Sequence, residues 1–437
     1  MHSENPMRFA LVLALAGAAS AQEPLKLTLK DAVALALKQN PRIILAQLET
    51  AQRQQDRAIS RSALLPQASA NVSETVHRVN LEAAIGFQFP NFPQHVGPYE
   101  TFQAGGVVTG PVLDLTLWRR YRASSFSVDA ARADELTARE DSVLLVVSQY
   151  LGGQRAAADV QAAQSRVQLA QALYDLASDL QKNGVGTGID TLRSNVQLQN
   201  EKQRLIVART QLETSLFGLA RLLSIDPVRK IELADSVSFF DTPAVAANQT
   251  LERAYAARPE LRQLAALEQR ATLEERSAGD SRLPRLSITA GWMEQGLTPQ
   301  TIIPVYTYQG NIDIPIFTGG RIQAERAKAA IALRQVKEQQ RDVRDRIALE
   351  VKTAIAQVES ARSEVEVANL GIQLARQEVE QARDRFQAGV ANNVEVIQAQ
   401  DELSRASDNQ IAALYRYNQA RASVAHATGQ MESLYAK

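Results

Sequence analysis

Two short segments of this 437-residue chain contain residue types that could do chemistry. Residues 183–190 and 388–395 each include a Gly-Val pair and end on a carboxylate, Asp190 or Glu395. The first segment is superficially similar to a glycine loop that binds phosphate through backbone N–H groups. Such a loop also needs a preceding strand and a lysine, and the first segment lacks both. The glycines are more simply explained as helix ends that turn through the left-handed conformation.

The two carboxylates have a simple structural explanation. Asp190 follows Thr187 by three residues, and Glu395 follows Asn392 by three residues. This spacing is typical of a capping box, and an acid in the first helical turn also suits the helix dipole. Helix capping therefore accounts for both acids without any further function.

The rest of the composition excludes most chemistry. The chain has no cysteine, and its four histidines are scattered without metal-ligand spacing. The 48 basic residues are balanced by 48 acidic ones, so the basic surface that nucleic-acid binding requires is not expected. We find no paired acid–base constellation and no nucleophile in a catalytic context. We therefore expect no enzyme, no cofactor, no metal site and no nucleic-acid partner.

The N-terminus has the pattern of an export signal over residues 1–21. Arg8 precedes the apolar run Phe9–Leu15, and a small-residue cleavage site follows at Ala19–Ala21. The mature chain is expected to start at Gln22. No cysteine follows the apolar run, so an N-terminal lipid anchor is not expected.

The elements that position the two segments occur twice along the chain. Pro41 and Pro66 recur as Pro259 and Pro284, both 218 residues later, and the first Gly-Val pair recurs 205 residues later. Each copy is far longer than the 20–50 residues of a solenoid repeat, so each is a domain-sized hairpin. We expect a first structural repeat over 22–225, a linker over 226–250, a second repeat over 251–430 and a short tail over 431–437.

Each repeat contains one very long helix, expected over 116–183 and 320–388. The second helix has large apolar residues seven apart, with alanine three positions after most of them. The first helix repeats this pattern with a gap at Gly153. A sustained heptad predicts a left-handed coiled coil, and alanine allows helix axes to approach closely. A coiled-coil scaffold would satisfy the heptads alone.

Three segments alternate with the period of two that indicates strands with one apolar and one polar face. They lie after Pro66, after Pro284 and before Pro315, and a weaker, glycine-rich strand is expected over about 102–112. Each is close to the 9–11 residues of a tilted membrane strand. Four strands do not close a barrel, and an open edge in lipid leaves backbone groups unpaired. We therefore expect several copies of the chain to share one sheet.

In this arrangement the chain resembles the TolC-type outer-membrane efflux channels. The resemblance rests on four segments: residues 27–41, their counterpart 251–261 in the second half, the strand-to-helix junction Pro315–Arg321 and the helix-turn tip Phe386–Ile397. It covers nearly the whole mature chain. The motifs are specific through their order, spacing and duplication rather than one by one.

The resemblance implies a mostly helical protomer with four strands and four long coiled-coil helices. Three protomers would form a twelve-stranded barrel in outer-membrane lipid above a twelve-helix periplasmic tunnel. Such a homotrimer would conduct substrate passively for an inner-membrane pump and a periplasmic adaptor, in a tripartite efflux or type I secretion system of a Gram-negative-type cell. Residues 80–101 and 294–306 would be the external loops, and the linker would lie on the outside of the tunnel.

The resemblance also implies roles at the tips. The adaptor-docking candidates are Gly184, Val185, Gly389 and Val390. Glu395 would form a ring of three carboxylates that favours cations at the narrowest point, and Asp190 occupies the corresponding acidic position of the first tip. For both acids a ring and a helix cap remain open alternatives.

The chain departs from the best-known members at three places. Gln398 stands at the second acidic position, Ala391 replaces an arginine latch, and the junction Pro111–Trp118 lacks the glycine pair of the second junction. The first two changes weaken the expected cation block and latch, and the third predicts a different bend. The alternative function is a periplasmic coiled-coil scaffold or adaptor without a pore.

Overall fold

The computed structural model describes residues 24–87, 93–235, 247–388, 390–391 and 393–436. The predicted signal peptide and part of the linker lie outside these residues. In chain order the elements are β1 (Leu25–Leu27), α1 (Leu29–Gln39), α2 (Pro41–Ser62), β2 (Gln67–Asn80), α3 (Leu81–Ile85), β3 (His95–Leu113), α4 (Leu115–Lys182), α5 (Gly188–Leu222), β4 (Ile231–Leu233), α6 (Ala247–Ala257), α7 (Pro259–Asp280), β5 (Arg285–Gly296), β6 (Ile303–Asp313), α8 (Arg321–Gln387), α9 (Asn393–Ala427) and α10 (Met431–Tyr435).

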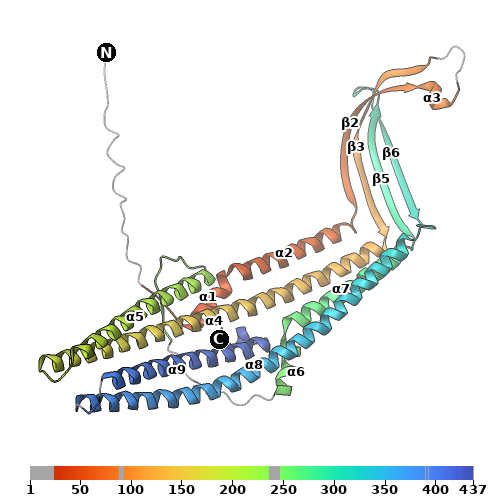
Figure 1. Ribbon diagram of the computed structural model, residues 1–437. Coiled ribbons are helices and arrows are strands. Elements are labelled where there is room, and N and C mark those ends of the chain that lie inside the picture. The colour runs from red at the N-terminus through yellow and green to blue at the C-terminus, as the bar shows by residue number, and fades with distance from the viewer. Residues whose placement is uncertain (1–23, 88–92, 236–246, 389, 392, 437) are drawn as a thin grey trace, which may run out of the picture. The chain divides into compact units, whose positions relative to one another are not determined.

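The predicted duplication is visible in this order of elements. Each half contains a helix broken before a proline, two strands, a helix of 67 or 68 residues and a second helix of 35 residues. The predicted long helices over 116–183 and 320–388 are confirmed as α4 and α8. Figure 1 shows each of them turning back into the shorter helix that follows it, α5 or α9.

The chain divides into two compact units, and each draws on both halves. Unit 1 comprises Met1–Pro41, Arg139–Thr250 and Val351–Lys437, and unit 2 comprises Arg42–Ala138 and Leu251–Glu350. Unit 1 thus contains both helix tips, whereas unit 2 contains the four-stranded sheet. We describe each unit by itself.

Unit 2 is built on an antiparallel sheet in the order β2-β3-β5-β6. The register puts Ala68, Val108, Ala290 and Tyr308 opposite one another on one face. Because successive side chains of a strand alternate between faces, Trp292 and Tyr306 lie on that same face, and their rings stack at 6.0 Å. The other face carries mostly polar residues such as Asn71, Thr289 and Gln309, with Val107, Met293 and Val305 among them. The predicted alternation of an apolar and a polar face is confirmed.

The strands are longer than the sequence pattern predicts. Strand β3 pairs with β5 only from Phe102 onward. Its first residues, from His95, pair only with Val76–Asn80 of β2, so these two strands extend from the sheet as a two-stranded ribbon. Strand β3 begins at His95, inside the predicted external loop 80–101, and β5 and β6 both extend into the predicted loop 294–306. These loop boundaries were therefore wrong. In these residues the strands still pair through their backbones, although their side chains no longer alternate between apolar and polar.

The two strand-to-helix junctions bend by different means, as their sequences predict. After β6, Gly319 and Gly320 adopt φ values of +58° and +84°, which side chains with a Cβ rarely accept. After β3, Asp114 accepts a bond from Leu117 N at 3.0 Å and so caps α4 with its side chain. The first junction, which lacks the glycine pair, thus bends at a helix start that is capped by the Asp114 side chain.

The heptad positions form the buried seams of unit 1. In α8, the large residues Val351, Val365, Ile372, Val379 and Phe386 are all buried. The alanine series is buried in both long helices, with Ala368 half-buried, whereas Val160, Val167 and Tyr174 of α4 are only half-buried. The seam is therefore more regular in α8 than in α4.

The gap at Gly153 has a structural reason. A Cβ at this position would lie 3.0 Å from Leu233 Cδ1 of β4, so the missing side chain leaves room for a strand of the linker. Strand β4 pairs in parallel with β1, and both strands contribute to the largest buried cluster of unit 1, together with residues of α1, α4, α5, α9 and α10.

A buried tyrosine ties these strands to α4. The Tyr150 hydroxyl lies 3.0 Å from the Leu27 carbonyl oxygen and 2.9 Å from Asp235 Oδ2. Asp235 in turn accepts a bond from Leu29 N at 2.7 Å. Burial, followed by the bond to Asp235, raises the pKa of Tyr150 above the ordinary value of a tyrosine.

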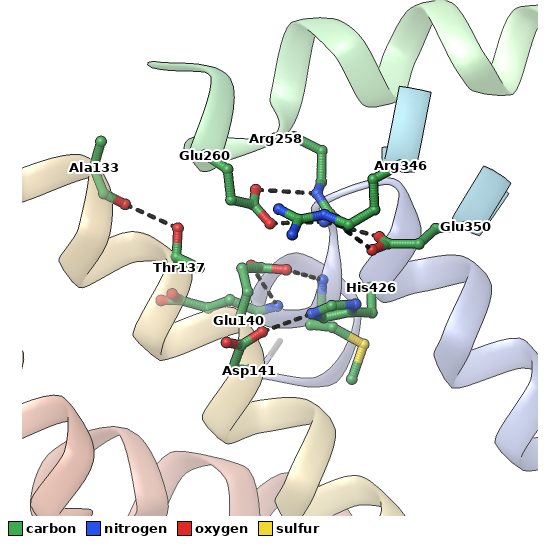
Figure 2. Close-up of polar contacts among 11 residues, drawn as sticks. Ala133, Thr137, Glu140, Asp141, Arg258, Glu260, Arg346, Glu350 and His426 are labelled. Carbon is green, nitrogen blue, oxygen red and sulfur yellow. Dashed lines mark hydrogen bonds and ion pairs between the residues drawn. The ribbon is translucent and has the colours of Figure 1, made fainter. Parts of the chain in front are cut away.

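Carboxylates hold the C-terminal end of unit 1 on α4 (Figure 2). The Glu140 side chain accepts bonds from the backbone N–H groups of Met431 and Glu432, at 2.8 and 3.2 Å. His426 Nε2 lies 2.8 Å from Asp141 Oδ1. Residues of α4 thereby bind the end of α9 and the start of α10.

In unit 2, a buried arginine connects α7 with α8. The Arg258 side chain is 4% exposed, and its guanidinium lies 2.7 Å from Glu260 and 2.9 Å from Glu350. Figure 2 shows both carboxylates converging on this group. Arg258 directly precedes Pro259, so the cluster fixes the proline-broken start of α7.

Candidate functional site at the helix tips

The first tip joins α4 to α5 through residues 183–187. Gly184 has φ +73°, and the N–H groups of Val185 and Gly186 both donate to the Leu180 carbonyl oxygen. These bonds satisfy the end of α4 in the way a left-handed glycine turn does, as the sequence predicts. The Val185 side chain is 76% exposed.

Asp190 lies in the first turn of α5 but does not complete a capping box. The Thr187 hydroxyl donates to Asp190 Oδ2 at 2.5 Å. Thr187 is the N-cap residue, yet its side chain accepts no backbone bond. Helix α1 shows the complete arrangement, with Thr28 accepting from Asp31 N and Asp31 accepting from Thr28 N. The carboxylate of Asp190 is thus held by a neighbouring hydroxyl rather than by the helix backbone.

The second tip joins α8 to α9. Gly389 and Asn392 lie outside the described residues. Val390 is 69% exposed, and its N–H donates to the Arg385 carbonyl oxygen at 3.0 Å. The docking candidates Val185 and Val390 are therefore both exposed apolar side chains.

Glu395, in the first turn of α9, lies beside a cation that the sequence analysis missed. Arg385 Nε of α8 is 3.1 Å from Glu395 Oε1, and both side chains are about half exposed. Gln398 follows one turn later on α9, with its side chain exposed. A basic residue in the last turn of a helix is favourable because of the helix dipole, and this was the available signal for Arg385.

A second residue missed from the sequence, Asn393, connects the two tips. Its Nδ2 donates to Ser194 Oγ at 2.7 Å and to the Asp190 carbonyl oxygen at 3.1 Å. Asn393 is 1% exposed. The structure therefore brings the start of α9 against the start of α5, so Asp190 and Glu395 belong to one contiguous region.

An apolar cluster supports this region from within. Phe386 of α8 and Val396 of α9 are buried against Leu173 of α4, together with Val379, Ala382 and Ala399. Within the described ranges, no group of His, Cys, Asp or Glu has the arrangement of a metal site. Nor does any helix of these ranges combine the length and the apolarity needed to cross a membrane.

The comparisons with known proteins agree with the arrangement of strands and helices. A sequence model of the family described as outer membrane efflux protein matches residues 32–224 and 250–430, one segment in each half. The chain belongs to this family. The resemblance inferred from residues 27–41, residues 251–261, the junction Pro315–Arg321 and the tip Phe386–Ile397 is thus confirmed. The family is one of channels rather than enzymes.

This outer membrane efflux protein has a curated relative in Pseudomonas aeruginosa, the pyoverdine export outer membrane protein OpmQ. The two are 22% identical over 374 residues, which is 82% of this chain and 75% of the relative.

Solved channels share the fold. The CmeC outer membrane channel of Campylobacter jejuni superposes with a TM-score of 0.82 at 19% identity, covering 92% of this chain and 85% of CmeC. The outer membrane protein VceC of Vibrio cholerae gives 0.80 at 16% identity, covering 92% and 96%. The open state of the Neisseria gonorrhoeae MtrE channel gives 0.78 at 16% identity, covering 92% and 88%. The predicted fold class, a mostly helical protomer with a four-stranded sheet, is confirmed.

Proposed function

We propose that this protein is the outer-membrane exit duct of a tripartite efflux or type I secretion system, working as a homotrimer and catalysing nothing. The observation that carries the proposal is the sheet of unit 2. Its outer strands, β2 and β6, each pair on one side only within the described part of the chain. Unpaired strand edges are costly in lipid and a template for pairing in water. Pairing of β6 with β2 of the next copy satisfies both edges.

The two faces of the sheet suit a closed barrel in outer-membrane lipid. The face with Trp292, Tyr306 and Tyr308 would contact lipid, and the polar face would line water, as in membrane barrels generally. Four strands from each of three copies would make the twelve-stranded barrel. The export signal predicted over residues 1–21 is consistent with this location.

In the proposed trimer, the tips would form the periplasmic mouth. Glu395 is proposed as the selectivity ring, with Asp190 and Gln398 as further lining residues. Val185 and Val390, with Gly184 and Gly389, are proposed to dock a periplasmic adaptor that serves an inner-membrane pump. Exposed apolar side chains at both tips suit a protein partner. The existence of a solved open state of MtrE supports a mouth that changes width.

The proposal is tested by the detergent-corrected mass of the mature protein extracted from washed outer membranes. We expect a mass close to three chains and release only with detergent. A monomer or dimer released without detergent would overturn the proposal and favour the coiled-coil scaffold. Channel recordings on the purified trimer then test conduction directly.

A further inference from the structure

A buried ion cluster lies between the two hairpins of unit 1. Arg166 of α4 points NH1 at two residues of α9, with Ser404 Oγ at 2.9 Å and Asp408 Oδ1 at 2.8 Å. Its Nε lies 3.5 Å from Glu201 Oε2 of α5. The Arg166 side chain is 17% exposed and that of Glu201 4%. One cation therefore contacts the first hairpin and the second hairpin together.

The cluster belongs to a polar stripe that follows the contact between α5 and α9. Gln197 Nε2 of α5 lies 3.3 Å from Glu201 Oε1 of the same helix and 3.3 Å from Asp401 Oδ1 of α9. Nearer the tips, the buried Asn393 contacts Ser194. Near the tips, the contact of α4 with α8 and α9 is apolar, whereas the contact between α5 and α9 includes these polar side chains.

Such a stripe specifies register more than it adds stability. Moving two charges out of water offsets much of the attraction between them, so a buried pair contributes little net free energy. Its best-attested role is to select one alignment of helices. Because the heptad seams of unit 1 repeat every seven residues, the helices could pack with one helix shifted along the other by seven residues. Arg166 contacts both Glu201 and Asp408 in only one of these registers.

We propose that Arg166 is a positioning residue that holds the two hairpins of each protomer together and so keeps their tips close. Applied to the proposed channel, this contact limits the width of the periplasmic mouth, and in that respect the inference rests on the proposed function. Arg166 lies about four helical turns before the end of α4. The contact that limits the mouth would thus lie away from the tip position occupied by Ala391.

Electrostatics give the direction of the change when Arg166 is removed. Glu201 and Asp408 lie against its guanidinium, and Asp159 of α4 interacts electrostatically with Arg166 and Asp408. Burial and the Asp408 carboxylate raise the pKa of Asp159, and Arg155 and Arg166 oppose that shift. Without Arg166 the carboxylates of α4, α5 and α9 repel one another across the contact, so α9 is expected to move away from α5.

The matched control is Arg204, which binds the same carboxylate. Arg204 NH1 lies 2.6 Å from Glu201 Oε1, but both residues belong to α5. Arg204→Gln removes a positive charge next to Glu201 without removing a contact between hairpins. A general effect of charge on folding would appear in both variants, whereas the proposed effect belongs to Arg166→Gln alone.

The absence of native cysteine makes distance measurement by spin labelling straightforward. We would label Val185→Cys and Val390→Cys in one chain and dilute it with unlabelled chains, so that each measured distance lies within a protomer. Arg166→Gln is expected to shift the distribution to longer distances, and Arg204→Gln to leave it unchanged. Arg166→Lys, which lacks the fork that reaches two acids, should give an intermediate shift. An unchanged distribution in Arg166→Gln would overturn the proposal.

Two further measurements keep the test decisive. If Arg166→Gln does not fold, Asp408→Asn removes the contact at a side chain that is 57% exposed, and the same longer distance is expected. In channel recordings, Arg166→Gln should raise the conductance relative to Arg204→Gln. Absence of conduction in every variant would contradict the proposed function, whereas the distance measurement decides the role of Arg166 independently.

Discussion

The carboxylate of Glu395 has a cation of its own chain beside it, which changes what a ring at the mouth would do. With Arg385 at 3.1 Å, each protomer contributes an ion pair rather than an isolated negative charge. We expect Glu395→Ala to leave the trimer intact and to lower the preference for cations, measured as the reversal potential in a salt gradient. Arg385→Gln is expected to raise that preference, because it removes a positive charge next to the carboxylate.

The control for this prediction is Arg405→Gln. Arg405 also pairs with a glutamate, Glu402 at 2.8 Å, but within the surface of α9, and its loss should leave the reversal potential unchanged. Both charge effects should shrink near 1 M salt, where the Debye length is about 3 Å. A reversal potential that is the same in wild type and Glu395→Ala would contradict the ring and leave the capping role.

Tyr150 allows a prediction for stability and its pH dependence. Tyr150→Phe removes the hydroxyl between Leu27 and Asp235. A hydrogen bond to a charged group contributes about 1.5–3 kcal/mol to stability, so we expect a loss of that order. The folded state raises the pKa of Tyr150, so this hydroxyl stabilises the fold fully below the unfolded pKa of about 10 and loses its contribution as the pH rises further. Thermal unfolding should therefore separate wild type from Tyr150→Phe at pH 8, and separate them less in strong alkali. A constant difference at both pH values would contradict the assignment.

At the scale of elements, the glycine junction between β6 and α8 can be tested by itself. Gly320 has φ +84° and open space around the Cβ position. Gly320→Ala is therefore expected to cost about 1–2 kcal/mol through backbone strain alone. Gly279 in α7 has equal space but no positive φ, so Gly279→Ala should be neutral or stabilise by up to about 1 kcal/mol. Unfolding in detergent measures both, and equal effects would contradict the strain argument.

The sequence predicts those elements that have a local period. The heptads of α8 identify its buried face, and the Gly-Val pairs identify the tips. The strands β1 and β4 have three residues each, too few for a period, so the parallel pair and the packing of Leu233 at Gly153 were not predictable. The partners Arg385 and Asn393 also went unnoticed, because their contacts depend on how helices supercoil around one another, which the spacing within one helix does not determine.

For the whole molecule, apolar side chains left uncovered on one chain indicate where copies meet. Val367, Leu370 and Leu374 of α8 are 72%, 57% and 56% exposed, although they follow the spacing of a helix face. We expect Leu370→Glu to weaken the proposed trimer, since a carboxylate buried in an interface costs on the order of several kcal/mol. Gln373→Glu, at a neighbouring exposed position, adds the same charge and should leave the mass unchanged. An intact Leu370→Glu trimer would place this face outside the interface.

The division into units has a consequence for biogenesis. Unit 1 is assembled from three separated stretches, and its largest core includes Leu27 near one end of the chain and Met431 near the other. This core is completed only when the last stretch has been synthesised, so its apolar residues stay uncovered until then. Contacts between such distant residues form slowly, and unfinished cores of this kind aggregate. For a chain exported as proposed, we therefore expect holding factors to protect it until its final residues have been delivered.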